Sequence, residues 1–293
     1  MNRVSPKVLA LLGALTLVWG TNWPLFRIAL DELPVWTFRT IVLTIALATL
    51  SVILLVRRES FAVPKGKWPA LILAAAMNIG IWNIATSLAV LSIPSGHASV
   101  LAYTMPLWVA LLGFVVYGQR LTPRLLAAIV IGAAAVAALM APNFRDYAQA
   151  PLGLFWGLLA GFCWAVGTFI VKRTTWPGMG LSLTFWQVAI CLPPIALGAL
   201  LLDGVPTHLP STKALAATIY TGAIPMALGT TAWFALVKAL PAQVAALSSI
   251  AIPIVAIVSG ILLLHEPLSW LQTAAIASTV ISLWLALVPG RHR

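Results

Sequence analysis

Two stretches of the chain repeat one pattern: residues 94–121 read PSGHASVLAYTMPLWVALLGFVVYGQRL, and residues 241–268 read PAQVAALSSIAIPIVAIVSGILLLHEPL. A shift of 147 residues superposes them without a gap. The matches that are specific in so apolar a chain are Pro94 with Pro241, Pro106 with Pro253 and Gly113 with Gly260. A shift of 145 residues also aligns Trp19 with Trp164. The pattern indicates a duplication that covers most of the chain.

The composition places both copies in a membrane. Of the 293 residues, 61% are hydrophobic and 8% are charged, whereas a soluble domain carries about 25% charged residues. Ten apolar runs are long enough to cross a bilayer, which takes ~20 residues. They are expected at residues 7–28, 33–56, 68–90, 97–117, 123–141, 151–172, 180–202, 213–236, 242–264 and 269–289. We therefore expect an all-α polytopic membrane protein of ten transmembrane helices.

The basic residues give these helices an orientation, because Lys and Arg gather in cytoplasmic loops. With the N-terminus placed in the cytoplasm, four of the 17 basic residues fall on the outer side, namely Arg27, Arg39, Arg145 and Lys213. The other 13 fall on the inner side. This bias predicts a multi-pass protein of the cytoplasmic (inner) membrane with both termini in the cytoplasm.

The two copies are expected to form two five-helix repeats, residues 1–145 and residues 146–293. Because five is an odd number, the second repeat enters the membrane from the opposite side, and the pair is inverted. Inverted repeats are common in transporters, where the substrate site lies near mid-membrane between the repeats. The sequence therefore favours a transporter that works by alternating access.

Other functional classes find little support. The net charge of +11 would suggest nucleic-acid binding in a soluble protein, but these basic residues sit in short loops between apolar runs. Cys163 and Cys191 lie inside apolar runs and lack the spacing of a metal site. We expect no metal, no cofactor, no nucleic acid and no enzymatic activity. The expected partners are a small-molecule substrate and the lipid bilayer, and a monomer is compatible with the sequence.

Three local motifs carry a family resemblance. Trp19-Gly20-Thr21-Asn22 stands near the N-terminus, and the second copy ends with His265-Glu266-Pro267-Leu268-Ser269. The first copy ends with Gly118-Gln119-Arg120-Leu121-Thr122, where Gln119 replaces the acid. With the ten-helix plan, these motifs resemble the drug/metabolite transporter superfamily of the EamA type over nearly the whole chain. Among its members, the chain is most similar to exporters of aromatic amino acids and related metabolites.

Polar and aromatic residues near the middle of the spans are candidates for a substrate site. A tryptophan at that depth is not explained by an aromatic belt, so it either packs in the bundle or lines a cavity. Amides and hydroxyls at that depth need a partner, which is either another helix or a cavity. As a set, the expected cavity-lining residues are Trp19, Asn22, Asn78, Trp82, Ser99, Tyr103, Trp164, Thr230 and Ser248.

Prolines, glycines and terminal basic residues suggest how the helices pack and bend. The prolines expected to break helices or to act as hinges are Pro94, Pro106, Pro225, Pro241 and Pro253. The spacing of four residues in Gly153, Gly157 and Gly161 predicts close helix packing. The side chains of Arg27, Arg39 and Lys172 lie near helix ends and are expected to extend to the membrane interface.

The leading functional hypothesis is an exporter of small amphipathic metabolites such as amino acids, built around a central neutral, aromatic-lined cavity. The alternative is a drug or cation efflux transporter. A proton-coupled exporter of that kind uses a membrane-embedded acid, and no Asp or Glu falls near the middle of an expected span. A distant alternative is an intramembrane enzyme, which would need a nucleophile or metal ligands at membrane depth.

Overall fold

A computed structural model of the chain describes residues 6–118, 150–204, 209–239 and 242–266, with isolated positions between 123 and 134 and between 270 and 281. Every regular element in the described residues is a helix. Six helical spans are long and apolar enough to cross a membrane: Val35–Arg57, Trp68–Ser92, Ser95–Val116, Pro151–Arg173, Leu181–Asp203 and Thr212–Leu236. The chain is therefore a multi-pass membrane protein.

The helices follow the apolar runs closely. The first part of the chain holds α1 (Pro6–Leu30), α2 (Val35–Arg57), α3 (Trp68–Ala75), the π-helix η1 (Ala76–Ile81), α4 (Trp82–Ser92), α5 (Ser95–Ala102) and α6 (Met105–Tyr117). The second part holds α9 (Ala150–Arg173), α10 (Leu181–Gly198), the π-helix η2 (Ala199–Asp203), α11 (Thr212–Thr221), the π-helix η3 (Gly222–Gly229), α12 (Thr230–Ala239) and α13 (Ala242–Leu264). The runs expected at 123–141 and 269–289 lie mostly outside the described residues.

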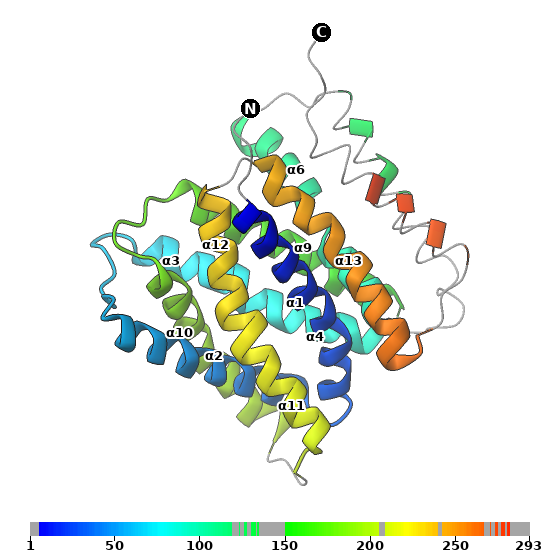
Figure 1. The fold of residues 1–293 in the computed structure, drawn as a ribbon, viewed down its shortest axis with the longest axis horizontal. Coiled ribbons are helices and arrows are strands. Elements are labelled where there is room, and N and C mark those ends of the chain that lie inside the picture. The colour runs from blue at the N-terminus through cyan, green and yellow to red at the C-terminus, as the bar shows by residue number, and fades with distance from the viewer. Residues whose placement is uncertain are drawn as a thin grey trace.

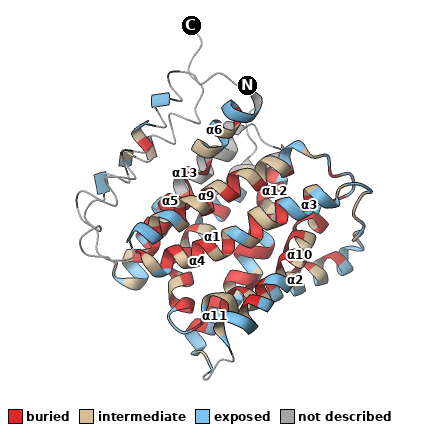
Figure 2. Ribbon diagram, turned by 180° about the vertical axis from the view of Figure 1, so that it is seen from behind, coloured by how far each residue is buried: buried red, intermediate tan, exposed pale blue. Residues whose placement is uncertain are grey.

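Helix α1 occupies the middle of the bundle (Figure 1). It packs against α13 and α11 and also contacts α4 and α5. Buried residues face the interior of the bundle, whereas exposed residues lie on the outer faces (Figure 2). Large apolar side chains are among the exposed ones, such as Leu200 at 74% and Val56 at 77% exposure. Lipid is the solvent that suits these outer faces.

Glycines allow α9 to lie directly against α4 and α5. A Cβ atom on Gly153 would stand 3.1 Å from Ser92 Cβ, and one on Gly157 would stand 2.6 Å from Leu101 Cβ. A Cβ atom on Gly161 would meet the backbone oxygen of Ala102 at 2.9 Å. These contacts confirm the close packing that the four-residue spacing predicted.

Glu266, just after α13, holds the first turn of α5. The backbone N–H and the hydroxyl of Ser95 donate to Glu266 Oε1 at 2.8 and 2.7 Å, and the N–H of Gly96 donates to Oε2 at 3.3 Å. The first N–H groups of a helix have no partner within it, so a carboxylate at this end satisfies them. The contact ties the chain after α13 to the start of α5, two segments that lie far apart in the sequence.

We predict that Gly161→Ala lowers the thermal stability of the purified protein in detergent. The added methyl group would overlap backbone oxygens that cannot move independently of α5, at a cost of about 1–3 kcal/mol. Gly13→Ala is the matched control, because a Cβ atom there meets nothing within 4 Å. An equal melting temperature for Gly161→Ala and the wild type would contradict the packing described above.

We also predict that Glu266→Ala destabilises the protein by about 1–2 kcal/mol, because three donors at the start of α5 lose their acceptor. Glu266→Gln keeps one acceptor oxygen, so its stability should fall between that of the wild type and that of Glu266→Ala. Glu59→Ala serves as the control, because Glu59 makes only an exposed ion pair with Arg57 at 3.8 Å and such pairs contribute little. Indistinguishable melting curves for all three variants would refute the role assigned to Glu266.

Candidate functional site

A cavity lies at the centre of the bundle, between residues of both sequence repeats. Its walls come from α1, α2, α4, the junction of α5 and α6, α9, and the α11–η3–α12 span. The lining residues are Trp19, Asn22, Trp23, Phe26, Arg39, Trp82, Asn83, Ala102, Tyr103, Met105, Trp164, Thr221, Pro225, Met226, Thr230 and Trp233. The cavity is thus aromatic, with a few polar groups.

One face of α1 forms a long side of this cavity. Trp19, Asn22, Trp23 and Phe26 are spaced by three and four residues, which places them on a single helical face. Seven residues separate the first from the last, so the face extends about 10 Å along the helix. Asn22 and α11 are joined across the wall, since the hydroxyl of Thr221 donates to Asn22 Oδ1 at 2.8 Å.

Tryptophans gather at the Trp19 end of the cavity. Trp19 and Trp164 meet edge to face, with ring centroids 6.1 Å apart and an interplanar angle of 88°. Trp82 approaches Trp164 at 5.0 Å, and Trp233 approaches Trp19 at 5.5 Å. Such pairs contribute about 0.5–1.5 kcal/mol each beyond the burial of their area. Trp19 and Trp164, which the 145-residue shift had paired, therefore contact each other directly.

The π-helices η1 and η3 lie at positions related by the 147-residue shift. The cavity wall includes Pro225 and Met226 of η3, and η1 ends directly before the lining residue Trp82. Such segments often occur at functional sites. Side chains of the cavity wall donate to carbonyl groups in these segments, which also accept the backbone N–H groups of Thr230 and Trp82. Trp19 Nε1 donates to the oxygen of Pro225 at 3.2 Å, and Asn83 Nδ2 donates to the oxygen of Ile79 at 2.7 Å. Gly229 makes room for Trp19, whose Nε1 would lie 2.7 Å from a Cβ atom there.

Six of the nine residues expected in the lining are found there: Trp19, Asn22, Trp82, Tyr103, Trp164 and Thr230. The side chain of Asn78 instead joins two helices, donating from Nδ2 to Gln187 Oε1 at 3.2 Å. Ser99 donates to the oxygen of Gly96 within α5 at 2.6 Å. The side chain of Ser248 lies outside the described residues.

The prolines occupy different kinds of position. Pro94 immediately precedes α5, and Pro106 is in the first turn of α6, after the turn at residues 103–104. Pro225 lies within η3, and Pro253 lies inside the continuous helix α13. Pro241 lies outside the described residues. Of the pair Pro106 and Pro253, only the first therefore stands at an interruption.

Arg39 is the main cavity residue that the sequence interpretation misplaced. It was expected to extend to the interface, but its side chain is fully buried and lines the cavity. Nε donates to Ser87 Oγ at 2.7 Å and Nη2 donates to Thr86 Oγ1 at 3.0 Å. The expectation of a neutral cavity is therefore wrong. The position of Arg39 near a helix end suggested that its side chain extends to the lipid headgroups. That prediction failed because two hydroxyls of α4 hold the guanidinium inside the bundle.

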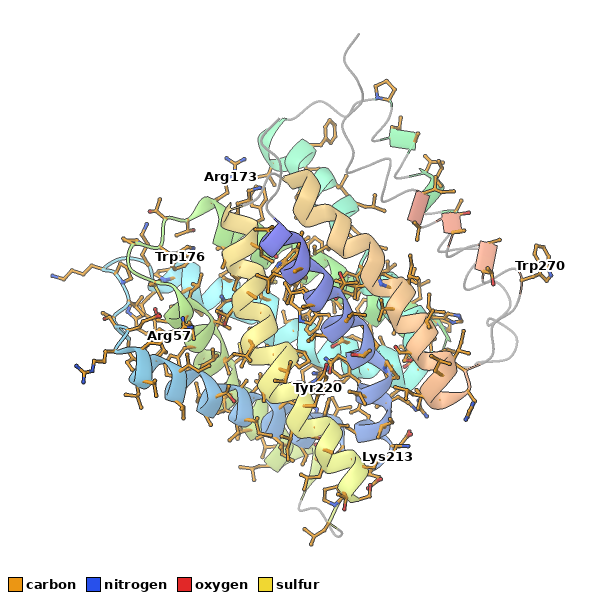
Figure 3. All side chains as sticks on the ribbon, in the orientation of Figure 1. Arg57, Arg173, Trp176, Lys213, Tyr220 and Trp270 are labelled. Atoms are coloured by element: carbon orange, nitrogen blue, oxygen red, sulfur yellow. The ribbon has the colours of Figure 1, made fainter. Side chains whose placement is uncertain are left out.

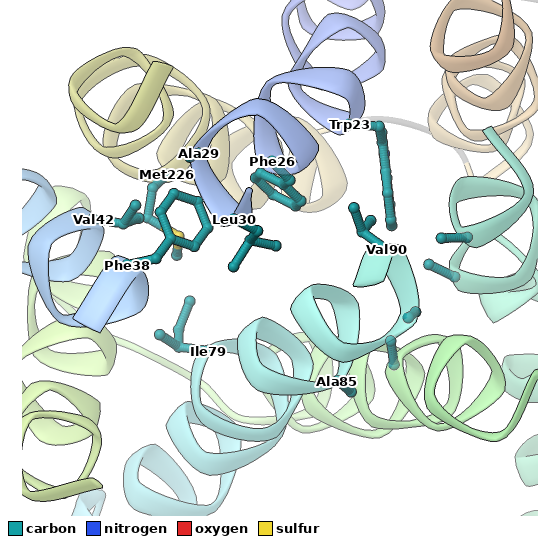
Figure 4. Packing of buried hydrophobic residues seen from close by; sticks show 14 of the residues in the cluster. Trp23, Phe26, Ala29, Leu30, Phe38, Val42, Ile79, Ala85, Val90 and Met226 are labelled. Carbon is teal, nitrogen blue, oxygen red and sulfur yellow. The ribbon is translucent and has the colours of Figure 1, made fainter. Parts of the chain in front are cut away.

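Aromatic rings also hold the guanidinium. Its carbon lies 4.2 Å from the ring centroid of Phe26 and 4.8 Å from that of Phe38. The two rings approach each other from α1 and α2 (Figure 4), with centroids 5.9 Å apart. A cation over a ring face is attracted to it, and more strongly when water is excluded. Arg39 thus marks the Phe26 end of the cavity as cationic.

Trp23, Asn83 and Trp233 are among the other lining residues that were not expected there. Trp23 carried a usable signal, because it shares the helical face of Trp19 and Asn22. Asn83 carried one too, since the 147-residue shift pairs it with Thr230. Nothing in the sequence distinguishes Trp233 from a packing residue.

The arrangement suits a small amphipathic molecule. Tryptophan rings offer flat apolar surfaces at the Trp19 end, and the Arg39 cation lies at the Phe26 end. The hydroxyl of Thr230 lies near the tryptophans, since it and Trp19 Nε1 donate to the same oxygen of Pro225. The lining contains no Asp or Glu among the described residues, so no carboxylate neutralises Arg39 from the cavity wall.

Comparison with known proteins agrees with a transport protein. The sequence model of the EamA-like transporter family matches twice, over residues 6–141 and 151–288. The uncharacterized transporter YvbV of Bacillus subtilis is 27% identical, over 94% of this chain and 90% of its own. A probable amino-acid metabolite efflux pump of Escherichia coli is 28% identical, over 90% and 89%. A probable terminal-alkyne amino-acid exporter of Streptantibioticus cattleyicolor is 28% identical, over 90% and 87%.

The fold is also shared with a protein of known crystal structure. That structure matches with a TM-score of 0.68 at 20% sequence identity, and the match covers 96% of this chain and 97% of the other. The family model matches most of the sequence, and the described residues form a bundle of helices. The chain belongs to the EamA-like transporter family.

Proposed function

We propose that this transporter exports small amphipathic metabolites such as amino acids, and that it does so by alternating access around the central aromatic cavity. The observation that carries the proposal is the cavity itself, because Trp19 and Trp164 meet there from two different repeats. A substrate site between repeats is the arrangement that alternating access needs, since each repeat can reopen a different side.

The proposal includes ten transmembrane helices in two inverted five-helix repeats, residues 1–145 and 146–293, with both termini in the cytoplasm. Two separate matches to one family model, each covering about half of the chain, support this division. The π-helices η1 and η3 at equivalent positions of the two halves support it as well. Of the two segments, η3 lines the cavity, as expected for irregular backbone in a membrane protein.

The names of the relatives support both export and the substrate class. Relatives from Escherichia coli and Streptantibioticus cattleyicolor are described as exporting amino acids or their metabolites. In this chain, the tryptophan rings would hold the apolar part of such a molecule, and Asn22, Tyr103 and Thr230 would offer hydrogen bonds to its polar part. The other expected site residues, Asn78 and Ser99, would then support the wall from behind.

Efflux of cations is less compatible with this site. A buried guanidinium repels a cationic ligand, and the lining has no acid among the described residues that would attract one. The proposed class therefore carries no net positive charge.

The proposed function is tested by flux in proteoliposomes. Purified protein is reconstituted and offered each of the twenty standard amino acids and a set of cationic dyes, with and without a pH gradient. We expect saturable flux of at least one amino acid, and dependence on the gradient would identify the coupling. Flux of the dyes without flux of any amino acid would overturn the proposal.

We predict that Trp19→Ala and Trp164→Ala reduce the initial transport rate roughly tenfold, which corresponds to about 1.4 kcal/mol, because each removes an apolar surface of the cavity. The amount of protein in the membrane should fall much less. Trp270→Ala is the matched control, because Trp270 is 81% exposed and points away from the bundle (Figure 3). Parallel losses of transport and expression would instead identify Trp19 and Trp164 as packing residues.

A further inference from the structure

We propose that the cavity contains a head-group site for an α-amino acid, in which Arg39 Nη1 binds the carboxylate and Asn83 Oδ1 accepts a hydrogen bond from the ammonium group. This inference rests on the proposed function and names the groups that select the substrate. It follows from two polar atoms of the cavity wall that are buried and have no partner among the described residues.

The hydrogen bonding of Arg39 is complete on one side only. Ser87 and Thr86 accept from Nε and Nη2, and each of these hydroxyls donates to a carbonyl of its own helix. The network therefore fixes the plane of the guanidinium and leaves Nη1, on a residue that lines the cavity, without a hydrogen-bond partner among the described residues. Guanidinium groups bind carboxylates through paired N–H donors in this plane. An anionic oxygen is the group that completes the arrangement.

The positive charge itself calls for a ligand. Buried charges in proteins are ordinarily paired, because an uncompensated one is costly. Arg39 is 0% exposed, and no ion pair joins it to an acid within the described part of the chain. Phe26 and Phe38 stabilise the cation in part. Ionisable residues retained within a membrane protein typically serve its substrate.

Asn83 supplies the complementary acceptor. Its Nδ2 donates to the oxygen of Ile79. Because a carbonyl oxygen can only accept, this contact identifies the nitrogen end of the Asn83 amide and therefore its oxygen end. The other end, Oδ1, is buried and has no partner among the described residues, and Asn83 is one of the residues that line the cavity. Asn83 also precedes Ser87 by one helical turn, which places their Cβ atoms about 5–6 Å apart. The acceptor thus lies next to the residue that orients Arg39.

The two ends of the cavity then match the two ends of an amino acid. Arg39 rests on Phe26, whereas the rings of Trp164 and Trp233 contact Trp19, about 10 Å away along α1. A zwitterionic head group at the Arg39 end would direct an apolar side chain toward the tryptophans. Recognition of the head group alone would leave the side chain to be selected by the fit among the rings.

Three probes that differ only in the head group test this assignment. L-Phenylalanine has both charged groups, phenylalaninamide lacks the carboxylate, and 3-phenylpropionate lacks the ammonium group. Binding to purified protein is measured from the quenching of tryptophan fluorescence, and uptake is measured in proteoliposomes. We expect the wild type to bind phenylalanine roughly 10- to 100-fold more tightly than its amide, which is the range for a hydrogen bond to a charged group.

Arg39→Met removes the charge and keeps the apolar stem. Loss of a buried unpaired cation should leave the fold intact or stabilise it, which is checked by melting temperature. We expect Arg39→Met to bind phenylalanine and its amide about equally. Arg39→Lys should keep part of the wild-type preference for phenylalanine. A purely structural Arg39 would weaken all three probes in parallel and leave this ratio unchanged.

Asn83→Leu should still bind phenylalanine more tightly than its amide. It should no longer bind phenylalanine more tightly than 3-phenylpropionate. The control is Arg27→Gln, because Arg27 pairs with Asp31 at 2.9 Å and lies outside the cavity lining. In Arg27→Gln, the preference for phenylalanine over its amide and the preference over 3-phenylpropionate should both equal those of the wild type. Separate loss of the two preferences in the two variants is the signature of a head-group site.

Three outcomes would overturn the assignment. These are equal binding of phenylalanine and its amide by the wild type, an unchanged ratio in Arg39→Met, and failure of all three probes to bind. If the flux panel still shows transport of an amino acid, the proposed function survives and only the head-group site fails. If the panel shows no amino-acid transport, the proposed function itself fails.

Discussion

The structure depends on one constraint: inside a bilayer no water is available, so each backbone polar group must find its partner within the protein. Helices meet this constraint within each span, and the π-helix η2 does so even where Leu200 is 74% exposed. The π-helix η3 supplies Pro225 and Met226 to the cavity wall, and η1 ends directly before the lining residues Trp82 and Asn83. The oxygen of Pro225 accepts from Trp19, and the oxygen of Ile79 accepts from Asn83. Each of these oxygens also accepts a backbone N–H, so the side chains that form the wall of the site are tied directly to the backbone of the two π-helices.

This double role links the shape of the cavity to its chemistry. Trp19 is held by Pro225 and stands against Gly229, where any larger residue would displace it. Its ring in turn meets Trp164 and Trp233. A movement of the α11–η3–α12 span would carry Pro225 and Trp233 with it and thereby reshape the aromatic end. The backbone irregularity at η3 thus gives a conformational change a direct route to the site.

The sequence predicted the six described spans, because each helix must present about twenty apolar residues to lipid, and such runs are readable without a structure. It also predicted most of the aromatic wall, since tryptophans near mid-span lie too deep for the interfacial belts. It missed Arg39, because distance from a helix end does not reveal which way a long side chain turns. It missed η1 as well, since no proline marks that segment. Asn78 and Ser99 were misassigned for a related reason: local sequence does not show whether a polar group has a partner on a neighbouring helix or on its own.

The packing around Arg39 shows why a cation can persist at such a site. Replacing a buried charge with an apolar residue is often neutral or stabilising, so stability alone gives no reason to keep the guanidinium with one nitrogen unsatisfied. Two hydroxyls and two aromatic rings surround it, which lowers the cost without removing the charge. The hydroxyls already donate to their own helix, so their role toward Arg39 is to accept and to orient. The arrangement holds a donor without a partner on a residue that lines the cavity, and a ligand that arrives and leaves would explain why it is kept.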